Sequence, residues 1–124
     1  MGELEGPQTT VPLKISASDT RHFDREGFSG NHYVEANSGR PFSALTVDVH
    51  GRHPRQRMVG ATRTYLVLEG TGTFTVNGTA SEIKPGDMFI IPDGGEYEYQ
   101  GTMRLFEFNV PSTTSTNVVN LDPE

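Results

Sequence analysis

Side chains that can bind anions or transfer protons lie close together between residues 50 and 63. Four of the ten basic residues of this acidic chain, whose net charge is −6, occur here as Arg52, Arg55, Arg57 and Arg63. A guanidinium group binds carboxylates and phosphates through two parallel hydrogen bonds. The cluster therefore favours an anionic ligand, steered inward by Arg52, Arg55 and Arg57. The alternative is that these three arginines belong to a solvated loop.

Two histidines, His50 and His53, flank Gly51 and Arg52 in the same segment. Imidazoles are frequent zinc ligands, and a metal site that combines them with Asp48 is one interpretation. Residues three apart on a strand point to opposite faces, so the two rings converge only if the chain turns back. We therefore expect both histidines at the surface or in a turn.

Bulk composition excludes several classes of protein. The chain of 124 residues has the length of one domain, and its negative charge argues against nucleic-acid binding. It has no cysteine, hence no disulfide or thiolate chemistry. No stretch approaches the roughly 20 apolar residues of a membrane span, and the polar N-terminus lacks a signal-peptide pattern. We expect a cytoplasmic protein without membrane partners.

Short runs of alternating or β-branched residues, separated by turns, indicate an all-β sandwich or barrel with little or no helix. Asn77-Gly78 is a strong signal for a type I′ hairpin turn. We expect a flexible tail at 1–11, one barrel domain at 12–111 with an edge strand at 12–16, and a tail or surface strand at 112–124. Residues 19–38 look irregular, with one short strand near 33–36. The remaining expected strands are 43–49, 64–69, 72–76, 79–83, 88–91, 96–100 and 104–110.

Two spaced motifs resemble those of the cupins, which are small jelly-roll barrels built as a double-stranded β-helix. They are Tyr-Leu-Val-Leu-Glu-Gly-Thr-Gly at 65–72, and Pro-Gly-Asp at 85–87 followed by Ile-Pro-Asp-Gly at 91–94. Most cupins bind a metal through two histidines and a glutamate before the first motif and a histidine after the second. Counting back from Gly70 and forward from Gly94, these positions carry Gln56, Met58, Arg63 and Tyr97.

The resemblance implies a metal-free barrel, because a divalent cation prefers imidazoles and carboxylates to this set of side chains. We therefore expect no cofactor and no metal. Strand alternation around these positions predicts a ligand pocket, closed on its far side by Phe106 or Phe108. Its expected lining is Gln56, Met58, Arg63, Tyr65, Tyr97 and Tyr99.

Arg63 must have a partner if it is buried, because an unpaired guanidinium inside a protein is very costly. The partner is either a ligand carboxylate or phosphate, or an internal carboxylate such as Glu96, Glu98, Glu107 or Asp48; rotation into solvent is the third option. Tyr97 is a candidate general acid if Arg63 lowers its pKa. If the protein is an enzyme, Tyr97 and Arg63 are its expected catalytic residues.

The leading interpretation is a metal-independent cupin that binds a small anionic organic molecule as a sensor, carrier or accessory subunit. The first alternative is a metal-free isomerase, epimerase or cyclase acting on a sugar nucleotide or keto acid. Such cupins usually pair an inward histidine base with a tyrosine acid, and here no histidine falls on an expected inward position. The second alternative is a metal-dependent, dioxygenase-like cupin. By analogy with cupins of this size we expect a homodimer, with the N-terminal strand as a plausible exchange element.

Overall fold

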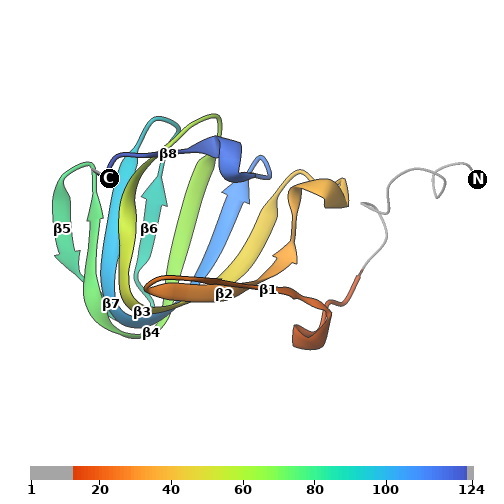
Figure 1. The fold of residues 1–124 in the computed structure, drawn as a ribbon, viewed down its shortest axis with the longest axis horizontal. Helices are drawn as coiled ribbons and strands as arrows, with labels where there is room; N and C mark the ends of the chain where they lie inside the picture. Colours follow the sequence, from red (N-terminus) through yellow and green to blue (C-terminus); the bar gives the residue numbers. More distant parts are fainter. Residues whose placement is uncertain (1–12, 123–124) are drawn as a thin grey trace, which may run out of the picture.

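The computed structural model describes residues 13–122, which form one eight-stranded antiparallel sheet rolled into a barrel (Figure 1). The only helical elements in this part of the chain are the three-residue 3₁₀ turns η3 (Ala17–Asp19), η4 (Ala36–Ser38) and η5 (Ser115–Asn117). The predicted all-β jelly roll is confirmed. The strands are β1 (Arg21–Arg25), β2 (Phe28–Val34), β3 (Ser43–Met58), β4 (Thr62–Val76), β5 (Thr79–Glu82), β6 (Met88–Ile91), β7 (Glu96–Val110) and β8 (Val118–Asn120).

Three long strands, β3, β7 and β4, lie side by side and run through both halves of the barrel. A row of glycines runs across the three strands: Gly101 of β7 pairs with Gly51 of β3 on one side and with Gly72 of β4 on the other. Gly101 has a φ of 140°, and a Cβ there would collide with the carbonyl oxygen of Thr71. The row lets all three strands bend together, so segments expected as separate short strands are continuous.

The sequence predicts one of two hairpins and does not predict the other. The predicted Asn77-Gly78 turn joins β4 to β5, and both residues have positive φ, 49° and 84°. The expectation of irregular structure over 19–38 is wrong, because β1 and β2 form a hairpin that extends the sheet from β3. Its sequence is polar, and its Glu26-Gly27 turn is a weaker signal than Asn-Gly.

The ends of the barrel domain also differ from expectation. Residues 13–16 of the expected edge strand are not in a strand, and Pro12 and the expected tail at 1–11 lie outside the described residues. After Pro111 the chain turns back, and β8 pairs with the end of β3. No helix among residues 13–122 is long and apolar enough to cross a membrane.

Candidate functional site

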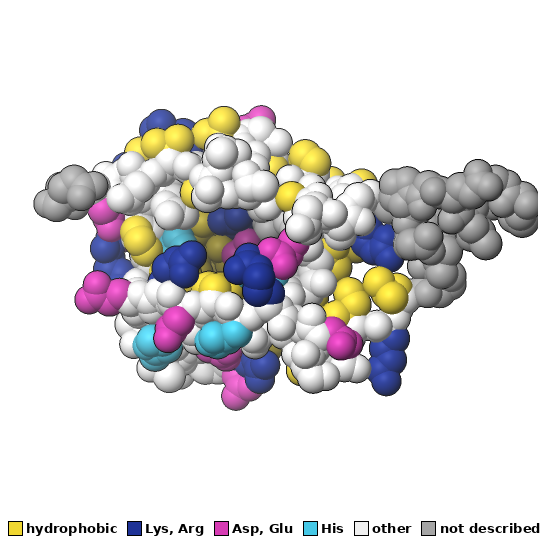
Figure 2. All heavy atoms as spheres, turned by 45° about the vertical axis from the view of Figure 1, so that its right-hand side comes forward, with side chains coloured by type: hydrophobic (Ala, Val, Ile, Leu, Met, Phe, Trp, Pro, Cys, Tyr) yellow, Lys and Arg dark blue, Asp and Glu magenta, His cyan; other side chains and the backbone are white. Residues whose placement is uncertain are grey.

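A cavity of about 560 Å³ opens between the β1–β2 hairpin and the segment that follows β7. In Figure 2 charged side chains stand around a hollow that has hydrophobic side chains inside it. One part of the lining is apolar and the other is polar. The apolar residues include Phe23, Phe28, Leu45, Val47 and Val118, and the polar ones include Ser43, Gln56, Arg63, Glu107 and Thr113.

The six predicted pocket residues divide into two groups. Gln56, Arg63 and Tyr99 line the cavity. Met58 and Tyr65, both with no exposed surface, and Tyr97, 1% exposed, do not line it and belong to the hydrophobic core. Three of the six predicted residues therefore line the cavity, and the other three lie deeper in the barrel.

The alternation of side chains at the end of β7 contradicts the expectation that Phe106 or Phe108 closes the cavity. Phe106 and Phe108 are only partly buried and do not line the cavity, whereas Glu107 and Asn109 are 5% and 0% exposed. The far side is therefore closed by polar groups rather than by phenylalanine. This places a carboxylate beside Arg63.

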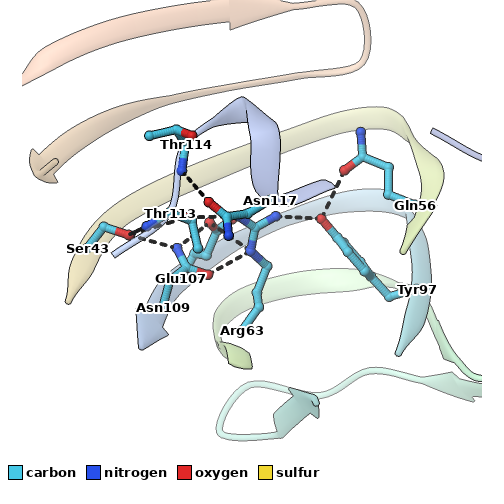
Figure 3. Close-up of polar contacts among 9 residues, drawn as sticks. All are labelled: Ser43, Gln56, Arg63, Tyr97, Glu107, Asn109, Thr113, Thr114 and Asn117. Atoms are coloured by element: carbon cyan, nitrogen blue, oxygen red, sulfur yellow. Dashed lines mark hydrogen bonds and ion pairs between the residues drawn. The ribbon is translucent and has the colours of Figure 1, made fainter. Parts of the chain in front are cut away.

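Arg63 is the centre of a buried hydrogen-bond network (Figure 3). Its Nη1 donates to the Tyr97 hydroxyl at 2.7 Å, and its Nε donates to Asn109 Oδ1 at 2.7 Å and lies 3.2 Å from Glu107 Oε2. Tyr97 in turn donates to Gln56 Oε1 at 3.1 Å. Asn109 Nδ2 donates to Glu107 Oε2 at 3.0 Å, which fixes the carboxylate. Of the three partners considered for Arg63, the internal carboxylate is the one present, and it is Glu107.

Electrostatics in this network follow from burial and from the Arg63–Glu107 pair. Burial opposes the charge of Arg63, but Glu107 and the neighbouring tyrosines outweigh it, so the pKa of the guanidinium is raised. Burial also raises the pKa of Tyr97, and Arg63 offsets only part of this effect. Arg63 therefore acts on Tyr97 in the expected direction, but burial outweighs it, and the pKa of Tyr97 lies above its ordinary value.

The residues at the expected ligand positions do not fit a divalent metal. Arg63 and Tyr97 are already hydrogen-bonded to each other, and a fixed guanidinium repels a cation. Gln56 directs its carbonyl oxygen at the Tyr97 hydroxyl rather than at an open site. Over residues 13–122, no group of three histidine, aspartate or glutamate side chains is arranged to hold a metal ion.

His53 is the main residue that the sequence placed wrongly. It is 5% exposed, lines the cavity and stacks on Tyr99 and Tyr97 with ring centroids 4.6 and 5.3 Å apart. His50 is exposed, as expected. His53 faces inward because β3 has a β-bulge. His53 pairs with Tyr99 and Gln56 with Tyr97, so the two residues between them on β3 oppose one residue of β7. The bulge allows both His53 and Gln56 to face inward.

The bulge also fixes the state of the His53 ring. Its Nδ1 lies 2.7 Å from the carbonyl oxygen of Pro54, which can only accept a hydrogen bond, so Nδ1 carries the proton. Burial lowers the pKa of His53 to about 4, with a smaller opposing effect of the Pro54 carbonyl. The imidazole is therefore neutral near pH 7, and its Nε2 carries a lone pair.

The β1–β2 hairpin supplies a wall that the sequence did not reveal. Phe23, Phe28 and His32 line the cavity, and the rings of His32 and Phe23 pack at a tilt of 44° with their centroids 4.9 Å apart. Burial, followed by the charge of Arg21, lowers the pKa of His32. At the edge, Arg21 pairs with Glu35 at 2.6 Å. Inward residues at alternate positions of β2 were the available signal, but glycine and polar residues obscured it.

Arg52, Arg55 and Arg57 lie on β3 rather than in a loop, and none of them lines the cavity. Arg52 pairs with Asp122 and Glu98, at 2.8 and 3.1 Å. Arg55 and Arg57 share Glu96, at 2.6 and 2.8 Å. These pairs connect β3 to β7 and to Asp122, two residues after β8. The arginine cluster thus supports the outside of the barrel, and only Arg63 among its four members faces the cavity.

A barrel with a buried polar network beside an amphipathic cavity defines a small-molecule type of site. The profile of the cupin domain family matches residues 43–104, half of the chain, so the protein belongs to the cupin family. The matched segment spans β3, β4, β5, β6 and most of β7.

Known proteins similar to this chain include enzymes. The Streptomyces nucleoside dehydratase Pac13 has a TM-score of 0.79 and 20% identity over 90% of this chain and 92% of its own, and one of its structures contains uridine. Ectoine synthase from P. lautus has a TM-score of 0.67 and 16% identity over 82% of this chain and 81% of its own. A 5-aminosalicylate 1,2-dioxygenase from Comamonas sp. is 49% identical over 35 residues, 28% of this chain, which spans 9% of that enzyme.

Proposed function

We propose that this cupin binds a small polar organic molecule in its barrel without a metal ion. The observation that carries the proposal is that three of the four positions aligned with cupin metal ligands form a hydrogen-bonded set beside a cavity of about 560 Å³. Gln56 and Arg63 from this set and Tyr99 line the cavity, and Tyr97 holds the first two in place. A pocket of this size and mixed lining is typical of small-molecule sites.

An anionic group on the ligand is better placed at the edge of the cavity than at its base. Glu107 already balances the charge of Arg63, so Arg63 alone does not require an anion. Arg25 lines the cavity, lies 5.8 Å from the centre of the Phe23 ring and has no carboxylate partner among residues 13–122. We therefore assign the contact with a ligand carboxylate or phosphate to Arg25.

A second candidate function is metal-free acid–base catalysis on such a molecule. The observation that favours it is His53, the inward histidine whose apparent absence from the sequence argued against an enzyme. The neutral Nε2 of His53 would accept a proton from the substrate. The Tyr99 hydroxyl, on a ring stacked 4.6 Å from His53, would donate a hydrogen bond to the substrate, since burial raises the pKa of Tyr99 and keeps it protonated. The fold likeness to a nucleoside dehydratase makes nucleosides, beside sugar nucleotides and keto acids, the first substrates to test.

The test combines metal analysis with thermal denaturation of the purified protein. We expect less metal than one ion per ten chains, and no change in melting temperature after EDTA treatment. A ligand at about 100 times its Kd should stabilise the fold by about 2.7 kcal/mol, seen as a higher melting temperature. One tightly bound metal per chain, lost with a drop in melting temperature, would reject the proposal. Light scattering on the same samples tests the proposed homodimer.

A further inference from the structure

The inward side of the cavity presents two hydrogen-bond acceptors that no described residue satisfies. The first is Nε2 of His53. Its Nδ1–H is donated to Pro54 O at 2.7 Å, so Nε2 can only accept. No side chain or backbone group of residues 13–122 donates to Nε2, although the ring is 95% buried and lines the cavity.

The second acceptor is an oxygen of Glu107. Asn109 and Arg63 both contact the same atom, Oε2, at 3.0 and 3.2 Å. Oε1 has no hydrogen-bond partner in the described part of the chain, and Glu107 is 5% exposed and lines the same cavity as His53. Glu107 Oε1 is therefore an acceptor that a donor on a molecule in the cavity can reach.

Building on the proposed binding function, we infer that the part of the ligand inside the cavity is a neutral polyhydroxy group, such as a sugar or the ribose of a nucleoside, whose hydroxyl groups donate to His53 Nε2 and Glu107 Oε1. A carboxylate or phosphate is disfavoured at these two acceptors, because its oxygens have no hydrogen to donate to them and are repelled by the Glu107 carboxylate. Hydroxyl groups also accept hydrogen bonds, and the amide nitrogen of Gln56 is free to donate since its oxygen is held by Tyr97.

The rest of the lining fits the same class of ligand. Phe23, Phe28 and Val47 form an apolar surface within the cavity, against which the less polar face of a sugar ring or a nucleobase packs. The polar side, from Ser43 to Thr113, supplies hydroxyl groups of its own. Arg25 at the edge leaves room for a charged substituent outside the inner part.

The experiment measures Kd by calorimetry for neutral probe pairs that share a ring and differ in their hydroxyl groups. The pairs are methyl ribofuranoside with 2-methoxytetrahydrofuran, and methyl glucopyranoside with 2-methoxytetrahydropyran; the second member of each pair has no hydrogen-bond donor. Benzoate serves as a carboxylate without a hydroxyl donor. We expect at least one hydroxylated probe to bind, and its donor-free partner to bind at least about tenfold more weakly.

Variants locate the effect. His53→Phe keeps an aromatic ring in the stack and removes the acceptor, so we expect a loss of about tenfold or more for the hydroxylated probe. His50→Phe changes the exposed histidine of the same strand and should leave Kd unchanged. Glu107→Gln tests the second acceptor, with circular dichroism as the check on folding. If that variant does not fold, His53→Phe and the probe pairs still decide the result.

The outcomes separate this inference from the proposed function. Equal affinity for hydroxylated and donor-free probes, or an unchanged Kd in His53→Phe, overturns the inference and leaves small-molecule binding intact. Binding of benzoate with no binding of either hydroxylated probe does the same. If none of these probes binds, and no nucleoside, sugar nucleotide or keto acid binds, both the inference and the proposed function fail.

Discussion

Arg63 Nη1 donates a 2.7 Å hydrogen bond to the hydroxyl of Tyr97, so two positions at which cupins usually place metal ligands contact each other directly. This bond is one edge of a network that includes Asn109 and Glu107 on the same strand as Tyr97. The network orders the polar side of the cavity by hydrogen bonds. Its stability can therefore be tested without knowing the ligand.

Replacing Arg63 should be strongly destabilising. Arg63→Ala leaves Glu107, 5% exposed, as an unpaired charge inside the barrel, which typically costs about 3–5 kcal/mol. Urea denaturation measures this difference in the free energy of unfolding. Arg25→Ala, at an exposed arginine that lines the same cavity, is the control and should change stability by less than about 0.5 kcal/mol.

A double variant tells whether the loss comes from the orphaned charge. Arg63→Met combined with Glu107→Gln removes both charges together, and we expect it to be clearly more stable than Arg63→Met alone. If the double variant is as unstable as the single one, packing around Arg63 rather than charge pairing holds this part of the barrel.

The protein should become less stable as the pH is lowered, because of His53. The pKa of its ring is about 4 in the folded protein against 6.5 for an unperturbed histidine. Between these values the unfolded chain binds a proton that the folded chain does not, so acidification from about pH 6.5 to 4 favours unfolding. The difference between the two pKa values corresponds to about 3 kcal/mol. Above pH 6.5 the contribution is complete and constant.

Comparison with His53→Phe isolates this contribution from the other groups that titrate. Urea denaturation at several pH values should give a shallower decline for His53→Phe than for the wild type, whereas His50→Phe should follow the wild type. Parallel curves for His53→Phe and the wild type would contradict the assignment of the buried neutral ring.

The fold could be predicted from the sequence because its turn residues and its two spaced motifs are local signals, although most of its strand pairs join distant segments. Asn77-Gly78 determines a hairpin by its backbone preference alone, and the motif around Gly70 sets the register that brings Gln56, Arg63 and Tyr97 together. The sequence predicts separate short strands on either side of these glycines, whereas β3, β4 and β7 are continuous. A glycine that lets a strand bend cannot be told in the sequence from a glycine that ends the strand.

The site could be predicted only in part, because two of its features depend on tertiary structure. The inward position of His53 follows from an irregularity in pairing between β3 and β7, which strict alternation does not anticipate. Glu107 was one of four carboxylates considered for Arg63, and only the parity of β7 decided between them. The β1–β2 wall was missed because its inward residues include glycine and histidine instead of a run of aliphatic side chains.

The bend of the barrel should depend on Gly101. Gly101→Ala places a Cβ against the carbonyl oxygen of Thr71 at a φ of 140°, so both strain and collision act on it. Gly78→Ala also has a positive φ, 84°, but no atom lies within 4 Å of its new Cβ. We expect Gly78→Ala to cost about 1 kcal/mol and Gly101→Ala clearly more, as measured by thermal denaturation. Equal effects would mean that the crowding at the glycine row is relieved by small backbone shifts.

Arg25 should select for anionic groups on the ligand without determining whether the ligand binds. Because it is exposed at the edge of the cavity, its attraction for a phosphate is screened by salt, and the Debye length falls to about 3 Å at 1 M salt. We expect Arg25→Ala to weaken binding of a nucleoside monophosphate several-fold at low salt, to lose that effect at high salt, and to leave the parent nucleoside unaffected. Calorimetry on the wild type and on Arg25→Ala, with both ligands at low and high salt, measures the Kd values to be compared. If the parent nucleoside loses affinity equally, Arg25 contacts the neutral part of the ligand and the charged group lies elsewhere.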